Sequence, residues 1–307
     1  MLLKSDISID TPDLPRILIA VPIFNEATYL PRVLGQLTAL PHDVLFVDDG
    51  SSDGTLEILD AAEARGEIAT VRHEQNKGYG AALIDAFRYA GEHGYDWVIT
   101  IDCDEQHDPA AIPSFVREIE TDQYDLVTSS RYLQASGDDD LPPIERRAVN
   151  LVITATINEL FGWNLTDTFC GFKAHRVKPT LEMNLDEHGY AFPLQLWPRV
   201  YAAGLRIKEI PVRRIYNDQN RSFGHDVRAG DLDNAKVRMG HYLAVLRDEL
   251  CGLRLPKLRD ATAAVAKQVL REPPTKLAGV SRESLMPEDL REVLSTGFAE
   301  AAAVPCD

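Results

Sequence analysis

Short apolar runs, each ending in polar residues and followed by a helical segment, constrain the fold of this chain more than any other feature. The first four, with their turns, are RILIAVPIF (16–24), DVLFVDDGSSDGT (43–55), IATVRH (68–73) and DWVITID (96–102). The intervening segments predict helices at 26–38, 55–64, 76–94 and 110–121. Strands that alternate with helices form a parallel sheet with right-handed crossovers. The pattern predicts an α/β fold with a Rossmann-like, mostly parallel sheet flanked by helices.

The second half of the chain continues this pattern less regularly. Strands are expected at 124–132, 171–176 and 206–216, helices at 145–161 and 192–203, and a mobile acidic loop at 136–143. From about residue 255 the chain is alanine-rich and interrupted by prolines, and short helices are expected at 257–271 and 287–295. We therefore divide the chain into a polar N-terminal segment (1–15), a main domain (16–250) and a helical C-terminal tail (251–307).

The charge of the chain argues against some partners. The formal net charge is −16 and the sequence pI is near 4.9, so most of the surface repels polyanions. We therefore expect no nucleic-acid partner, and we expect unassisted docking on anionic lipid to be disfavoured.

The sequence indicates neither export nor a membrane span. The N-terminal segment is polar and contains two prolines, unlike a secretory signal. The most apolar internal stretch, 151–157, is far shorter than the roughly 20 residues that a spanning helix needs. The four cysteines, Cys103, Cys170, Cys251 and Cys306, are far apart, which favours free thiols in a reducing compartment. We therefore expect a cytoplasmic protein.

Polar residues follow the predicted strands at the edge where such sheets bind ligands. The strand ends carry PIFNE, DDGSSDG, EQNKG and DCDEQHD, and ligands bind beyond the carboxyl ends of parallel strands. Asp102 and Asp104, two residues apart at the end of a strand, can approach one hard cation, and Mg²⁺ or Mn²⁺ suits such carboxylates. Gln106 and His107 extend this group.

Three further residues on this edge are candidates for nucleotide binding. Asp49 follows the second strand, where a carboxylate can accept hydrogen bonds from a base or a ribose. Glu26 is similarly placed for ribose hydroxyls. Lys77, in NKGYG, precedes a predicted helix N-terminus, which is a natural place for phosphate.

Six segments in a fixed order resemble the motifs of the family 2 inverting glycosyltransferases, the family that includes dolichol-phosphate mannose synthase. They are VPIFNE (21–26), FVDDGSSDGT (46–55), NKGYGAA (76–82), TIDCDEQHDP (100–109), SSRY (129–132) and TDTFCGFKAHR (166–176). The resemblance covers roughly residues 16–250, and the shared order makes it specific. It implies the GT-A fold and the metal-dependent transfer of a sugar from a UDP- or GDP-sugar.

The resemblance also implies a donor site. A divalent cation, Mg²⁺ or Mn²⁺, would be held against the donor diphosphate by Asp102, Asp104 and Gln106. The donor nucleotide would contact Pro22, Phe24, Asn25, Glu26, Asp49, Lys77, Gly78 and Asp102.

An acceptor phosphate, carried by a polyprenyl or dolichyl lipid, is implied by basic residues further along the chain. Arg131 follows the fifth strand, and Arg146 and Arg147 begin the next helix, where basic side chains suit a phosphate. Alternatively, Arg146 and Arg147 form a solvated helix face. Asp104, Arg131 and Asp167 are the candidate catalytic residues.

The chain departs from the family pattern at three places. Cys103 and Glu105 replace the usual alanine and leucine around the metal motif, and Gln195 replaces an expected glutamate. The late cluster YNDQNRSFGHD (216–226) lacks its lysine, and Arg221 and Ser222 are candidates to substitute in binding the acceptor phosphate.

Other functions remain open at this stage. A hydroxyl acceptor would need a carboxylate base, for which Asp167 and Glu187 are candidates, although Asp167 could equally cap a turn. A nucleotidyltransferase usually has a glycine-rich, basic loop after the first strand, whereas PIFNEATYL has no glycine. A catalytically silent nucleotide-binding module is a third alternative.

The predicted acceptor raises the question of membrane contact. The helix at 145–161 could touch a bilayer peripherally, or its apolar side chains could complete the core. The tail could act as an oligomerisation arm.

Overall fold

The computed structural model describes residues 14–134, 138–217, 225–226, 230–255, 258 and 261–265. Arg221, Ser222 and the helix expected at 287–295 lie outside the described residues, as do the N-terminal segment 1–13 and most of the tail.

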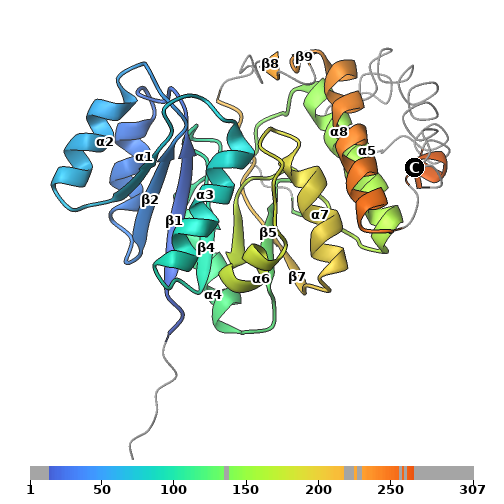
Figure 1. Cartoon of the computed structure of the whole chain (residues 1–307), viewed down its shortest axis with the longest axis horizontal. Coiled ribbons are helices and arrows are strands. Elements are labelled where there is room, and N and C mark those ends of the chain that lie inside the picture. The colour runs from blue at the N-terminus through green and yellow to red at the C-terminus, as the bar shows by residue number, and fades with distance from the viewer. Residues whose placement is uncertain are drawn as a thin grey trace, which may run out of the picture.

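A seven-stranded sheet forms the centre of the molecule (Figure 1). Its strands lie in the order β3-β2-β1-β4-β6-β5-β7, and β6 alone runs antiparallel to its neighbours β4 and β5. The strands are β1 (Ile17–Ile23), β2 (Asp43–Asp48), β3 (Ala69–Arg72), β4 (Trp97–Thr100), β5 (Leu126–Ser130), β6 (Lys173–Arg176) and β7 (Ile207–Pro211). The prediction of a mostly parallel sheet is thus confirmed.

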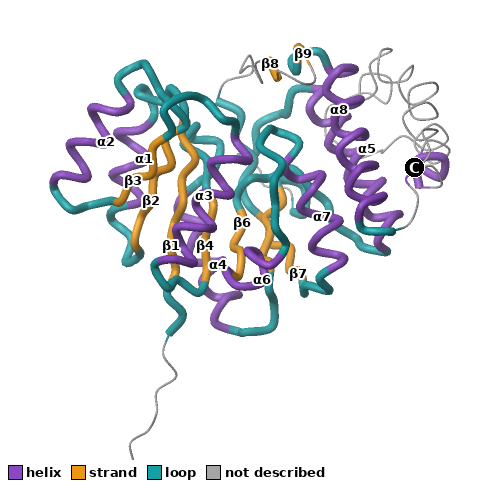
Figure 2. The backbone as a smooth tube through the Cα atoms, in the orientation of Figure 1, coloured by secondary structure: helices purple, strands orange, loops and turns teal. Residues whose placement is uncertain are grey.

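Helices flank the sheet, as Figure 2 shows. They are α1 (Leu30–Leu37), α2 (Thr55–Ala64), α3 (Tyr79–Glu92), α4 (Ile112–Glu120), α5 (Ile144–Phe161), α6 (Val177–Glu182), α7 (Phe192–Ala202) and α8 (Ala235–Gly252), with a 3₁₀ turn η1 (Pro109–Ala111) before α4. A small hairpin, β8 (His225–Asp226) and β9 (Gly230–Asp231), precedes α8. The helices α5 and α8 contact each other at the end of the molecule away from α2 (Figure 1).

The first helix begins four residues later than the sequence predicts. Asn25, directly before the predicted start, has a positive φ of 56°. The main-chain N–H of Glu26 donates to the hydroxyl of Thr55 at 3.0 Å. The segment after β1 is therefore held as a loop against the start of α2, and this places it at the carboxyl edge of the sheet.

Alternate residues of the strands face two separate cores. Leu18 and Ala20 of β1 lie in the core that includes α3, α5, α7 and α8. Ile17 and Ile19 lie in the core that includes α1, α2 and α4. Burial on both faces explains why these strands are nearly continuous apolar runs.

Most apolar residues of α5 belong to the first core. Val152, Ile153 and Ile157 are fully buried there, so these side chains complete the core, which was one of the two roles considered for this helix. Among the described residues, no helix is both long and apolar enough to cross a membrane.

Two of the four cysteines are buried free thiols, Cys103 and Cys170. Cys251 is disulfide-bonded, which corrects the expectation of a free thiol at that position. Linear spacing could not show this because a disulfide depends on which segments the fold brings together.

Candidate active site

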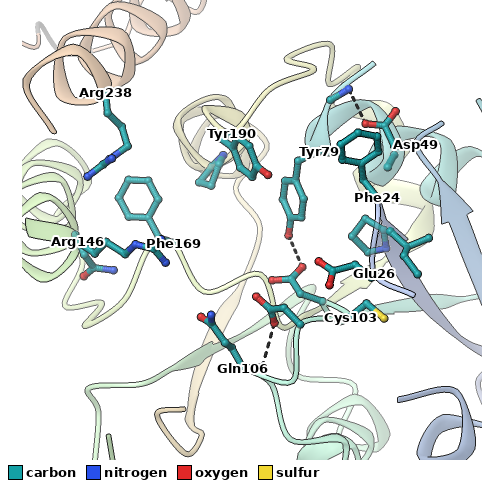
Figure 3. A pocket seen from close by; sticks show the side chains of 18 of the residues that line it. Phe24, Glu26, Asp49, Tyr79, Cys103, Gln106, Arg146, Phe169, Tyr190 and Arg238 are labelled. Carbon is teal, nitrogen blue, oxygen red and sulfur yellow. Dashed lines mark hydrogen bonds between the residues drawn. The ribbon is translucent and has the colours of Figure 1, made fainter. Parts of the chain in front are cut away.

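One pocket collects the polar ends of the strands with the first turns of four helices, α3, α5, α7 and α8. Its wall includes Pro22, Phe24, Glu26, Asp49, Gly78, Asp102, Asp104, Gln106, Arg131 and Arg146, all predicted from the sequence. Figure 3 shows Glu26 and Asp49 at one end of this pocket and Arg146 at the other. The fold therefore brings acidic and basic candidates into a single cavity.

The acidic end is built by the loop that follows β4. Asp102 and Asp104 both line the pocket, and Asp104 accepts a hydrogen bond from the main chain of Gln106 at 3.0 Å. The side-chain nitrogen of Gln106 is buried without a hydrogen-bond partner, which points to a bound group that satisfies this side chain.

The loop fits a hard divalent cation that is shared with a ligand. Among the described residues, no group of three His, Cys, Asp or Glu side chains is arranged to hold a metal ion. Mg²⁺ in enzymes is commonly bound by one or two carboxylates, with substrate phosphate oxygens and water completing its shell. Asp102 and Asp104 could hold such an ion, with Gln106 beside them.

Two residues that the sequence analysis missed support Asp102. The hydroxyl of Tyr79, the first residue of α3, donates to Asp102 Oδ1 at 3.0 Å (Figure 3). Gly171 lies against the same carboxylate, because a Cβ atom there would be 2.8 Å from Asp102 Oδ2 and 2.5 Å from the Tyr79 oxygen. Both residues occur in quoted motifs, but the motifs do not show this contact.

Replacing Gly171 with alanine is expected to raise the concentration of Mn²⁺ needed for half-maximal activity about 10- to 100-fold, because the added methyl group displaces Asp102. The measurement is a Mn²⁺ titration of activity, with the melting temperature recorded in parallel. Gly35→Ala is the matched control, since a Cβ at Gly35 meets nothing within 4 Å. Equal Mn²⁺ requirements in Gly171→Ala and wild type would contradict the expectation.

Asp49 fixes the loop that enters α3. Its carboxylate accepts hydrogen bonds from the main-chain N–H groups of Lys77 at 2.7 Å and Gly78 at 2.8 Å. Gly78 has a φ of 107°, and a Cβ there would lie 2.3 Å from the carbonyl oxygen of His188. Only glycine fits this position. Lys77 contributes its main chain here, while its side chain is exposed and does not line the pocket.

His73 is a further partner of Asp49 that the sequence analysis missed. Its ring nitrogens lie 2.7 Å from Asp49 and 2.9 Å from Asp85, and its side chain is almost completely buried. The signal was present, since His73 is a polar residue at the end of the third apolar run. Its function here is to hold Asp49 in place.

Asn25 contributes differently from its neighbours. Pro22, Phe24 and Glu26 line the pocket, whereas Asn25 does not. Its side-chain oxygen accepts from the main chain of Ser52 at 2.8 Å, so it ties the loop after β1 to the loop after β2.

The basic end is organised around an ion pair between the half-buried Arg131 and the buried Asp167. Arg131 donates to both carboxylate oxygens of Asp167, at 2.7 and 3.1 Å, and Asn150 donates to Asp167 at 2.6 Å. Burial alone would raise the pKa of Asp167, but the neighbouring Arg131 guanidinium outweighs burial and lowers that pKa to about 2. Asp167 does not line the pocket; it positions Arg131, which does.

The two arginines at the start of α5 have different environments. Arg146 lines the pocket, whereas Arg147 does not. The guanidinium of Arg147 lies over the ring of Tyr132, 3.7 Å from its centre, and donates to Asn150 at 3.2 Å. Both residues are half-buried, so a fully solvated helix face does not describe them.

Two other sequence features have structural roles. Gln195 is buried and accepts hydrogen bonds from the main chains of Asp186 and Glu187 at 2.7 and 2.8 Å. Its amide nitrogen donates to Glu249 of α8 at 2.6 Å, which a glutamate could not do when ionised.

Asp139 and Asp140, in the expected mobile loop, accept hydrogen bonds from the main chains of Arg214 and Tyr216.

Comparisons of the sequence and the fold with known proteins agree on the class of protein. A model of the family described as "Glycosyl transferase family 2" matches residues 18–182. The sheet topology and the structural neighbours reported below are those of the GT-A glycosyltransferase fold. The chain belongs to glycosyltransferase family 2, and it is a glycosyltransferase.

Relatives of this chain include bacterial and archaeal enzymes. It is 33% identical over 213 residues to the undecaprenyl-phosphate mannosyltransferase of Micrococcus luteus, covering 67% of this chain and 86% of that protein. It is 31% identical to the polyprenol monophosphomannose synthase of Mycolicibacterium smegmatis, covering 64% and 76%. The UDP-N-acetylglucosamine–dolichyl-phosphate N-acetylglucosaminyltransferase of Methanococcus voltae is 27% identical, covering 70% and 91%.

Two solved structures share the fold. Glucosyl-3-phosphoglycerate synthase from Mycobacterium tuberculosis, in complex with Mn²⁺, UDP and glucosyl-3-phosphoglycerate, superposes with a TM-score of 0.55 at 21% identity, covering 79% of this chain and 81% of that chain. TarS from S. aureus, in complex with UDP, superposes with a TM-score of 0.53 at 13% identity, covering 94% and 87%. Likeness at these identities establishes the fold.

Proposed function

We propose that this enzyme transfers a sugar, with inversion, from a UDP- or GDP-sugar to a polyprenyl phosphate, and that it uses Mg²⁺ or Mn²⁺. The observation that carries the proposal is the division of one pocket into an acidic end, with Asp102 and Asp104, and a basic end, with Arg131 and Arg146. The relatives named for undecaprenyl-phosphate and polyprenol substrates support this acceptor class.

The acidic end is suited to the donor. A carboxylate pair repels a diphosphate unless a cation lies between them, which is the reason for assigning the ion to Asp102 and Asp104. The bound cation would supply Lewis-acid stabilisation of the charge that develops on the leaving diphosphate. Pro22, Phe24, Glu26 and Asp49 then lie where the nucleoside would sit. Asn25 and Lys77 would help by fixing the loops that carry these residues.

The basic end is suited to an acceptor that carries its own negative charge. A lipid phosphate is ionised near neutral pH and can attack the anomeric carbon without a protein base, provided that it is held in line. Arg131, fixed by Asp167, would hold the attacking phosphate. The sugar–diphosphate bond breaks as the phosphate oxygen–sugar bond forms on the opposite face, which inverts the anomeric configuration.

A hydroxyl acceptor fits this pocket less well. It would require a carboxylate that accepts a proton, and neither Asp167 nor Glu187 lines the pocket. The pKa of Asp167 is about 2 because of its ion pair with Arg131, which outweighs its burial. Such a weakly basic group removes a hydroxyl proton poorly. We therefore assign to Asp167 the positioning of Arg131 instead of proton transfer.

A polyprenyl phosphate lies in a membrane, so the proposed function requires membrane contact. We propose peripheral contact on the cytoplasmic face. The role of residues 251–307 in a homo-oligomer stays a prediction, since most of this segment lies outside the described residues.

The test of the proposed function is a transfer assay with labelled UDP- and GDP-sugars. Labelled sugar is expected in a polyprenyl-phosphate product with one nucleotide class, in the presence of Mn²⁺ and not of EDTA. The corresponding polyprenol, which lacks the phosphate, is the matched control and should accept no sugar. Transfer to polyprenol at an equal rate would favour the hydroxyl-acceptor alternative. Metal-dependent nucleotide binding without any transfer would favour a silent binding module.

A further inference from the structure

The helix α8 contributes a buried arginine to the pocket from outside the region matched by the family model. That match ends at residue 182, whereas Arg238 lies in the first turns of α8. Its side chain lines the pocket although the residue is only 3% exposed. Tyr242, one turn further along α8, lines the pocket too. One face of α8 is therefore a wall of the cavity.

Arg238 faces Arg146 across the basic end of the pocket. Figure 3 shows the two side chains reaching the cavity from different helices, on either side of Phe169. Burial lowers the pKa of Arg238, and Arg146 lowers it further by charge repulsion, against the opposing influence of Tyr242, Glu145 and Asp233. Two like charges that line one desolvated cavity favour the binding of an anion there.

The position of Arg238 is fixed before any ligand binds. Its guanidinium donates hydrogen bonds to the carbonyl oxygens of Leu232 and Asp233. The first turn of α8 is capped by Asn234, whose side chain accepts from the main chain of Lys236 at 2.9 Å and of Val237 at 3.2 Å. The arginine is therefore preorganised, so binding an anion needs little further ordering of this side chain.

Arg131 and Arg147 are each held by a neighbouring side chain. Arg131 is bound through two hydrogen bonds to Asp167, so much of its charge is balanced within the protein. Arg147 lies over Tyr132 and does not line the pocket. Arg146 and Arg238 line the cavity from two separate helices.

We propose that Arg146 of α5 and Arg238 of α8 together bind the phosphate of the acceptor, and that α8 is therefore part of the acceptor site. This inference rests on the proposed function. Arg131, which lines the same pocket, would bind this phosphate together with the pair. The same pair distinguishes an acceptor phosphate from an uncharged polyprenol.

The test compares Arg238→Gln with Arg238→Lys. Loss of a charged hydrogen-bonding partner is expected to raise the KM for polyprenyl phosphate about 10- to 100-fold, while the KM for the donor stays within about twofold. Arg238→Lys keeps the charge and is expected to recover part of the loss. Arg247→Gln is the matched control on the same helix, because Arg247 pairs with Asp248 and does not line the pocket.

A second readout separates binding from folding. Inhibition by a short-chain, water-soluble prenyl phosphate is expected to weaken in Arg238→Gln, while calorimetric binding of the donor nucleotide and the melting temperature show that the variant is folded. An unchanged acceptor KM in a folded Arg238→Gln would overturn the inference and leave the proposed function intact. A wild-type enzyme that never uses polyprenyl phosphate would instead overturn the proposed function itself.

Discussion

Replacing Asp104 with alanine is expected to lower glycosyl transfer about a thousandfold. Asp104 is one of the two carboxylates proposed to hold the cation at the acidic end of the pocket. Without the ion, the leaving diphosphate loses electrostatic stabilisation of about 4 kcal/mol, which corresponds to that factor in rate. Transfer rates at saturating donor and acceptor measure the effect, and titration of the nucleotide by calorimetry with Mn²⁺ should show weakened binding.

Glu105→Gln is the matched control for Asp104→Ala. Glu105 lies in the same loop, but its carboxylate pairs with Arg32 at 3.3 Å and does not line the pocket. We expect this variant to keep wild-type activity within about threefold, since an ion pair with an exposed arginine contributes little. If Asp104→Ala retained both metal dependence and activity, the assignment of the cation to this loop would be wrong.

Replacing Asp167 with alanine is expected to destabilise the protein by about 3 kcal/mol, because the half-buried Arg131 would be left without its carboxylate partner. Acceptor turnover should fall as well, since the orientation of Arg131 is lost. Urea denaturation measures the free energy of unfolding, and transfer assays measure activity. The matched control is Glu67→Ala at the fully exposed Arg65–Glu67 pair, where no measurable change is expected.

The stabilising contribution of Asp167 should depend on pH in a defined window. Its folded-state pKa of about 2 is below the ordinary value of 3.8, because the pairing with Arg131 outweighs burial. The contribution is therefore fully present above about pH 4 and is lost as the pH falls toward 2. The stability difference between wild type and Asp167→Ala should shrink across this window. A difference that stayed constant down to pH 2 would show that the contribution of Asp167 does not depend on its charge.

The strands and their polar ends could be predicted because they depend on local information. A strand buried on both faces must be apolar along its length, and it must end where the chain turns to the surface. This places Asp49 after β2 and Asp102 after β4, and both line the pocket. The resemblance of the motifs predicted that the protein is a family 2 glycosyltransferase, and the family match then confirmed this.

The pattern of apolar runs could not predict the direction of β6. An apolar run predicts a strand but not its neighbours, and β6 pairs antiparallel with β4 and β5. The sequence could not predict the roles of Asn25 and Lys77 either. Each is adjacent in sequence to residues that line the pocket. However, the Asn25 side chain accepts a hydrogen bond from Ser52, and the main chain of Lys77 donates to Asp49.

The sequence by itself determined the strands at the centre of the fold, the acidic loop after β4 and the family, because these depend on short apolar runs and on motifs in a fixed order. Only the tertiary structure decided that Asp167 supports Arg131 from outside the pocket, and that Arg238 enters it from α8. The physical reason is distance along the chain. Arg146 and Arg238 line one pocket because α5 packs against α8, and no local pattern records that packing.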